Sequence, residues 1–333
     1  MQKIEFVLFQ IDQARMLLQE GSLPAIRVAL MLLDNSVELL LDRWIEDDMG
    51  HENIYERIIA QAHKKEIPKD IPELEHLFTR RYFKASEKKK LARFFDEKVI
   101  YMTKIKKIFP QYIGKILSQL HRYRNQAYHS GVMRPEIFKT FTTIYYELCC
   151  RLFEYISFSS ICYYSADNFS WIKNKFGVDI LNFNEDMFPK ILENLRTGFL
   201  ANENSLQKIL IENLEQRVKE VLKNLHFISV DCGISSDQVS ALSKAKRFTI
   251  ANLKKFPPYE PIPPNLEKRL TFTKIKSVEK NINYIKKSNN ELYAFKKYAD
   301  SDVFLERIEF VVNKFVNAIN QAIEMQSDLK RGK

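Results

Sequence analysis

The sequence predicts an all-α fold, and three observations lead to that class. The chain has 333 residues, of which 45% are hydrophobic, enough to bury a sizeable core. Glycine occurs only eight times, and tight β-hairpin turns need glycine. Apolar residues recur at helical spacing through most of the chain. No two glycines form the G-x-G spacing, which also disfavours Rossmann and P-loop phosphate sites.

The first quarter of the chain predicts three helices. The first covers residues 5–19 and ends at Gly21. Ser22 and Pro24 open the second, since proline is tolerated in the first helical turn, and we expect it to run to about Asp48. Residues 54–65 predict a third helix, and the two prolines in residues 67–72 predict a break.

The next segment is basic and aromatic over residues 80–95, and we expect helix in its second half. Pro110 interrupts a long helical pattern. The helix that follows places one row of side chains on a single face, namely Ile113, Ile116, Leu117, Leu120, Arg124 and Ala127. Gly131 is a candidate C′ residue for that helix. Pro135 then opens a helix predicted over residues 136–164.

A composition shift near residue 166 predicts two regions. Residues 1–165 form a helical bundle, and residues 166–333 form an α-helical accessory or recognition region. The second region predicts helices over 205–225, 235–246 and 302–326, the last with Ser301 as N-cap. Its proline-rich segment near residues 254–265 is expected to be irregular and extended.

The charge balance predicts an anionic partner. The formal net charge is +10, which favours nucleic acid over other partners. The four cysteines form no C-x-x-C pair and are interpreted as reduced thiols of a cytoplasmic protein. The most apolar long stretch, residues 144–164, carries three charged residues, so we expect a buried helix and no membrane span.

The segment LHRYRNQAYHSG, residues 120–131, contains the strongest candidate for chemistry. Arg124 offers a planar fork of donors suited to phosphate, and His129 can move protons near neutral pH. We expect His129 at the frayed end of the helix, where unwinding would bring its imidazole toward the guanidinium. Structural alternatives exist, because a histidine also suits a helix C-terminus and an arginine can snorkel. Spacing alone proves little, since Arg57 and His63 match it too.

RNQAYH resembles the R-x(4–6)-H motif of HEPN domains, in the common form with a polar residue after the arginine. The motif stands between the last two long helices of the predicted N-terminal bundle, as it does in that family. The run A-x-x-L-x-D-N-x-x-E-L-L-L in the second helix, residues 29–41, is also similar. The resemblance covers roughly residues 1–165 and does not extend to the rest of the chain.

The resemblance implies a metal-independent endoribonuclease of a toxin or anti-phage defence system, with no cofactor. In that reading Arg124 and His129 are the catalytic pair and Asn125 supports them. The 2′-hydroxyl of RNA would attack the adjacent phosphate, giving a 2′,3′-cyclic phosphate and a 5′-hydroxyl. The family implies a homodimer with a composite active site, and an antitoxin or sensor protein is a further expected partner. A non-catalytic module that binds RNA or protein, and a purely structural adaptor, are the alternatives.

Weaker candidates lie outside the motif. Asp34 and Glu38 could bind a metal, pair with Arg124 or form a solvated edge, and the structural roles are favoured. Basic residues interleaved with aromatics suit single-stranded RNA, although an exposed basic helix with core aromatics is the slightly favoured interpretation. The candidate RNA-binding residues are Arg80, Arg81, Lys88, Lys89, Lys90 and Arg122.

Overall fold

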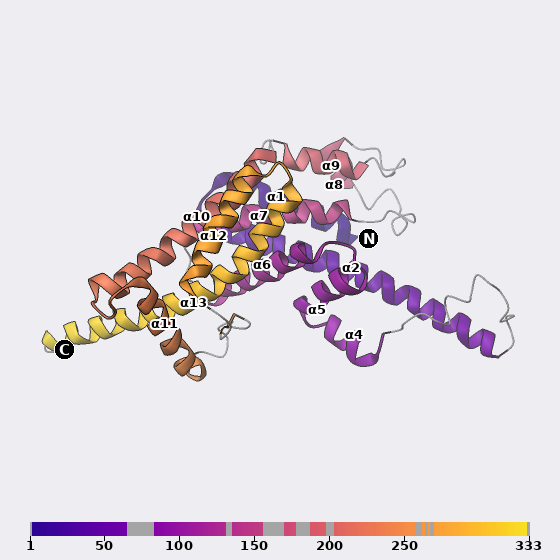
Figure 1. The fold of residues 1–333 in the computed structure, drawn as a ribbon. Coiled ribbons are helices and arrows are strands. Elements are labelled where there is room, and N and C mark those ends of the chain that lie inside the picture. The colour runs from indigo at the N-terminus through magenta and orange to yellow at the C-terminus, as the bar shows by residue number, and fades with distance from the viewer. Residues whose placement is uncertain are drawn as a thin grey trace.

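The computed structural model describes residues 2–64, 83–130, 135–155, 170–177, 187–197, 203–256, 262–263, 266 and 270–331. Within those ranges every regular element is a helix, which confirms the all-α prediction. The helices pack side by side as an elongated bundle, and the far end of α2 (Leu23–His63) projects from it (Figure 1).

Helices α1 (Gln2–Glu20) and α2 pack against each other as an antiparallel pair. Gly21 sits between them with a φ of 75°, a left-handed conformation that glycine adopts without strain. Its N–H donates to the carbonyl of Leu17 at 3.2 Å. The Ser22 hydroxyl accepts from the Ala25 N–H at 3.3 Å, as an N-cap does. The predicted boundary at Gly21 and Ser22 is therefore confirmed.

Helix α2 has 41 residues and does not stop near Asp48. Residues 54–63 are helical as predicted, but they continue α2 and do not form a separate helix. Asp48, where the second helix was expected to end, has tertiary partners. Asp48 accepts from the Tyr101 hydroxyl at 3.0 Å and from the Lys106 Nζ at 2.5 Å. These contacts give the polar turn a reason to remain helical.

Two short helices, α4 (Ala85–Leu91) and α5 (Phe95–Ile100), precede a π-helical turn over Tyr101–Ile105. Lys98 fixes α5 to α2, with its Nζ 3.1 Å from Glu38 and 2.6 Å from Asp42. The predicted interruption at Pro110 is confirmed, because α6 (Gln111–Ser130) begins at the next residue.

Helices α6 and α7 (Pro135–Glu154) carry the central core. The apolar members of the predicted α6 row are all buried, namely Ile113, Ile116, Leu117, Leu120 and Ala127. Helix α7 begins at Pro135 as predicted. Gly131, and the predicted extension of this helix from residue 156 to 164, lie outside the described residues.

The later helices cover α6 and α7. Helix α10 (Glu203–His226) packs on α7, and α13 (Glu291–Lys330) packs on α6. Helix α12 (Phe272–Lys287) lies beside α10 and α13 (Figure 1). Helix α8 (Ser170–Phe176) lies against α1, and α9 (Met187–Arg196) lies against α7. Helix α11 (Gln238–Asn252) follows a π-helical turn over Phe227–Asp231 and precedes a 3₁₀ turn over Leu253–Lys255.

The start of α13 corrects another prediction. Asn290 is the N-cap, and its side-chain oxygen accepts from the Tyr293 N–H at 3.0 Å. Ser301, the predicted N-cap, is buried inside the helix, where its hydroxyl donates to the carbonyl of Lys297 at 2.9 Å. A serine that bonds back one turn satisfies its own polar group and need not end the helix.

Residues on both sides of the predicted domain boundary contribute to a single hydrophobic core. The boundary itself, near residue 166, lies outside the described residues, as does most of the proline-rich segment near residues 254–265. The helix that carries the motif is therefore held by the N-terminal helix α2 and by the C-terminal helix α13.

Candidate functional site

A buried carboxylate on α2 gathers three side chains from two other helices. Asp34 Oδ1 lies 2.8 Å from His121 Nδ1 and accepts from the Tyr145 hydroxyl at 2.8 Å. Its Oδ2 forms an ion pair with Arg124 Nε at 3.3 Å. Burial, with Asp34 nearby, raises the pKa of Tyr145 well above its usual value, so this phenol stays protonated and donates. A buried charge needs such partners to offset its lost hydration.

Arg124 is held on two sides and still reaches solvent. Besides the ion pair with Asp34, its Nη1 donates to Asn125 Oδ1 at 2.8 Å. About a third of the side chain, 32%, remains exposed. Asn125, expected to support the catalytic pair, thus contacts the arginine. The result is a guanidinium with a fixed orientation and an exposed part, as phosphate recognition requires.

Asp34 and Glu38, for which metal binding, pairing with Arg124 and a solvated edge were considered, both form ion pairs. Asp34 pairs with Arg124, and Glu38 pairs with Lys98 at 3.1 Å. Nowhere in the part of the chain that the structure describes do three His, Cys, Asp or Glu side chains group as metal ligands. Both carboxylates thus have structural partners among the neighbouring helices.

The end of α6 differs from the expected frayed end. The helix continues through His129 to Ser130, and the position of the His129 side chain lies outside the described residues. His129 follows Arg124 by five residues, and each helical residue turns about 100°, so the two positions lie about 140° apart around the axis. Because the helix stays wound, α6 does not bring positions 124 and 129 onto one face.

Sequence reasoning missed His121. It precedes Arg124 by three residues, and residues three apart share a helix face. Its ring stacks on Phe95 of α5, with the ring centroids 4.1 Å apart and an angle of 4° between the planes. The spacing H-x-x-R was visible in the sequence, but the shared partner Asp34 stands 87 residues earlier in the chain.

Arg122, predicted to contact RNA, is engaged elsewhere. Its Nε donates to Glu306 Oε1 of α13 at 2.9 Å, and its Nη2 contacts Gln119 and Glu306. Burial alone would lower the pKa of Arg122, but the bonds to Glu306 raise it, so the group stays charged. We therefore assign Arg122 to the interface between α6 and α13 instead of to an RNA contact.

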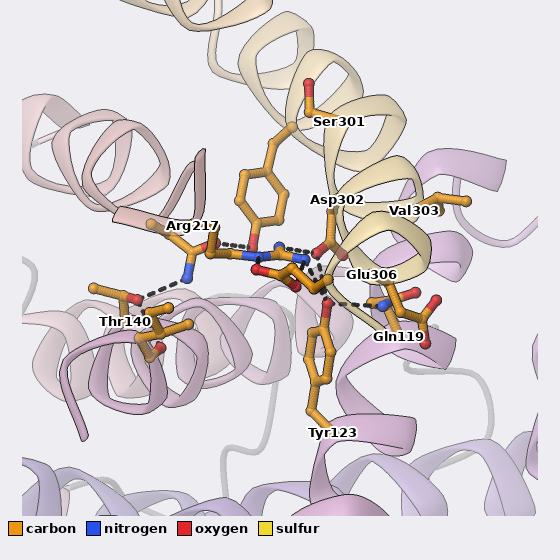
Figure 2. A network of polar contacts seen from close by, with 12 residues as sticks. Gln119, Tyr123, Thr140, Arg217, Ser301, Asp302, Val303 and Glu306 are labelled. Carbon is orange, nitrogen blue, oxygen red and sulfur yellow. Dashed lines mark hydrogen bonds and ion pairs between the residues drawn. The ribbon is translucent and has the colours of Figure 1, made fainter. Parts of the chain in front are cut away.

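That interface continues into a buried polar network centred on Arg217 of α10. The side chain is fully buried, pairs with Asp302 and Glu309 of α13, and contacts the Tyr123 hydroxyl at 2.8 Å. Figure 2 shows its guanidinium between Asp302 and Tyr123, with Glu306 and Gln119 close by. Tyr123 precedes Arg124 by one residue, so this network fixes α6 directly behind the candidate site.

The remaining RNA-binding candidates lie on or before α4. Lys89 and Lys90 are exposed in its last turn and Lys88 is half-buried, whereas Arg80 and Arg81 lie outside the described residues. Arg93 and Phe94 follow them and are also exposed, Phe94 to 56%. Phe95 then turns inward to stack on His121. This chain segment therefore leads from an exposed basic turn to the group formed by Asp34, His121, Arg124 and Tyr145, which we call the Asp34 cluster.

Two of the described cysteines lie in the core. Cys149 and Cys150 are buried free thiols, and burial raises the pKa of both, which keeps them protonated and unreactive. Cys232 is partly exposed, and Cys162 lies outside the described residues. Among the described helices, none is both long and apolar enough to span a membrane.

No protein-family model, curated protein or solved structure matches the chain. Functional inference therefore rests on the site itself and on the resemblance of its motif.

Proposed function

We propose that this protein is a metal-independent endoribonuclease of the HEPN type, acting as a toxin or defence effector. One observation carries the proposal: Arg124 is fixed by Asp34 and Asn125, yet keeps about a third of its side chain exposed. An arginine that serves only in packing can be fully buried. An arginine that serves only as a solvated surface charge requires no buried carboxylate. A phosphate-binding arginine benefits from both.

The chemistry assigns a role to each motif residue. Arg124 would hold the non-bridging phosphate oxygens as negative charge builds on them in the transition state. His129 would act as general base or acid, and Asn125 would keep the guanidinium oriented. Since the 2′-hydroxyl is the nucleophile, DNA should not be cut. A homodimer with a composite active site, as the resemblance implies, would supply a second motif to the same cleft.

The segment from α4 to α5 supports RNA as the substrate. Its exposed Lys89, Lys90 and Arg93 can contact phosphates, and the exposed ring of Phe94 offers a face for a base. The same segment carries Phe95, which touches His121 in the Asp34 cluster. The basic and aromatic groups thus belong to the part of the chain that packs on the candidate site.

The test is cleavage of total RNA and tRNA in EDTA. We expect the wild type to leave 2′,3′-cyclic phosphate and 5′-hydroxyl ends, and Arg124→Ala and His129→Ala each to lose about 100-fold or more in rate. Arg57→Ala is the matched control, because Arg57 also precedes a histidine at similar spacing and is exposed on α2. Its rate should equal that of the wild type.

Three outcomes would count against the proposal in different ways. Equal cleavage by all four proteins would remove Arg124 and His129 from the reaction. Salt-sensitive RNA binding without cleavage, and without toxicity on expression, would favour the non-catalytic RNA-binding module. Absence of any affinity for RNA would exclude both RNA functions.

A further inference from the structure

We infer that His121 is a second catalytic histidine, the general base that takes the proton of the 2′-hydroxyl beside Arg124. This inference rests on the proposed ribonuclease function and adds to it a residue outside the R-x(4–6)-H motif. Its basis is the Asp34 cluster, where one carboxylate holds His121 through Oδ1 and Arg124 through Oδ2.

The contact with Asp34 determines which ring nitrogen is available. His121 Nδ1 lies 2.8 Å from Asp34 Oδ1, and a carboxylate only accepts hydrogen bonds, so the proton is assigned to Nδ1. In neutral imidazole the lone pair then resides on Nε2. A carboxylate on one nitrogen, with a basic second nitrogen, is the arrangement by which an aspartate orients a catalytic histidine.

The ring is also held in plane and remains partly accessible. Phe95 stacks on the ring with 4.1 Å between centroids, and this contact opposes rotation of the imidazole about its Cβ–Cγ bond. The His121 side chain keeps 19% exposure, whereas its partner Asp34 has 1%. A histidine that served only to satisfy Asp34 could be buried as completely as Tyr145, which bonds the same oxygen and is fully buried.

His121 lies on the same helix face as Arg124, whereas position 129 does not while the helix stays wound. It stands one turn before Arg124, on the same face of α6, and shares Asp34 with it. A phosphate held by Arg124 therefore lies within one turn of the His121 position. Position 129 lies about 140° around the axis from Arg124.

The step balances with water as the only co-reactant. The 2′-oxygen attacks phosphorus while its proton passes to His121 Nε2, and the bond from phosphorus to O5′ breaks. The departing O5′ takes a proton from His129, the general acid, which the second motif of the proposed dimer can supply to the same cleft, and His129 regains a proton from water. His121 then returns its proton to water, so the enzyme ends as it began.

The experiment compares His121→Asn, His121→Ala and His226→Ala with the wild type, in EDTA, across pH. Asparagine keeps a donor for Asp34 but cannot carry a proton, and His226 is an exposed histidine at the end of α10. We expect both His121 variants to lose about 100-fold or more in rate, and His226→Ala to lose nothing. Added imidazole should restore part of the His121→Ala rate, which a structural role would not allow.

The pH dependence of cleavage provides a second readout. The ionisable groups that contact His121 or share its partner are Asp34 from α2, Arg124 from α6 and Tyr145 from α7. We expect the acidic limb of the wild-type rate profile to disappear in His121→Asn, because no base remains to be protonated there. The limb should persist in His226→Ala.

A measurement on the wild type needs no variant to fold. Nitrogen-15 spectra of the imidazoles should show His121 with its proton on Nδ1 when neutral. A proton on Nε2 would overturn the inference. Full activity of His121→Asn, or no imidazole rescue, would overturn it while leaving the proposed function intact. A wild type that cuts no RNA would overturn the proposed function and this inference together.

Discussion

Arg217 and Asp302 form an ion pair at a point where neither side chain reaches solvent, and the hydroxyl of Tyr123 bonds to both. The pair joins α10 to α13, and through Tyr123 it joins both to α6. Burial raises the pKa of Asp302 above its usual value, and the guanidinium of Arg217 opposes that shift. The helix that carries the candidate motif is thus fixed by charges from the C-terminal part of the chain.

Replacing Arg217 by Met should be strongly destabilising. The change leaves Asp302 and Glu309 buried without their cation, and breaking a buried pair costs about 3–5 kcal/mol. Chemical denaturation measures the loss as a shift in midpoint. Lys208→Met is the control on the same helix, because its pair with Glu212 is exposed and should change stability by less than about 1 kcal/mol. Equal shifts for the two variants would contradict this view of the network.

Gly114→Ala should destabilise the protein although alanine favours helix. An added Cβ would lie 2.7 Å from Thr103 Cγ2 and 2.8 Å from Val99 Cγ1, and both neighbours are stiff β-branched side chains. We expect a net cost of about 1–3 kcal/mol. Gly50→Ala in α2 meets nothing within 4 Å and should instead stabilise by about 1 kcal/mol. Thermal denaturation of the two variants should show shifts of opposite sign.

Stability should fall steeply above pH 10. Burial raises the pKa of Tyr123, Tyr145, Tyr146 and Tyr298 above the usual value near 10, so the folded protein keeps protons that the unfolded chain releases. Their contribution is complete below pH 10 and is lost progressively as the pH rises. Each group accounts for at most about 1.4 kcal/mol per pH unit.

Denaturation midpoints between pH 9 and 11 test this dependence. Between pH 9 and 11, Tyr146→Phe should reduce the fall in the free energy of unfolding by about 0.7 kcal/mol per pH unit, because it removes one retained proton that the unfolded chain is only half releasing near pH 10. Tyr284→Phe is the control, since Tyr284 is 52% exposed in the folded protein. A slope that Tyr146→Phe leaves unchanged would show that this phenol does not hold its proton in the folded protein.

If RNA lies along α4, Lys89→Gln combined with Lys90→Gln should weaken binding. Each lost phosphate contact should reduce the slope of log K against log salt by about 0.7 for single-stranded RNA. Fluorescence anisotropy at several salt concentrations measures that slope. Lys208→Gln combined with Lys223→Gln removes the same charge from the exposed face of α10 and should leave the slope unchanged. An equal effect of both double variants would indicate unspecific attraction by net charge.

Local sequence signals were sufficient to predict the helical class and several helix boundaries. Glycine scarcity and apolar stripes are local properties, and the apolar stripe of the helix predicted over residues 205–225 is buried along its length, from Leu206 to Leu225 of α10. Gly21, Pro110 and Pro135 mark helix ends because their backbone preferences act on adjacent residues only. Such signals need no knowledge of distant parts of the chain.

Other features depend on contacts between distant parts of the chain. Helix α2 continues past Asp48 because Tyr101 and Lys106 bond to it, and Ser301 lies inside α13 because its hydroxyl bonds back to Lys297. The candidate site depends on Asp34, which meets His121 and Arg124 across nearly ninety residues of sequence. The motif could be found in the sequence, but the partners of its arginine could not. Those partners come from helix packing, and local sequence patterns do not show which distant segments pack together.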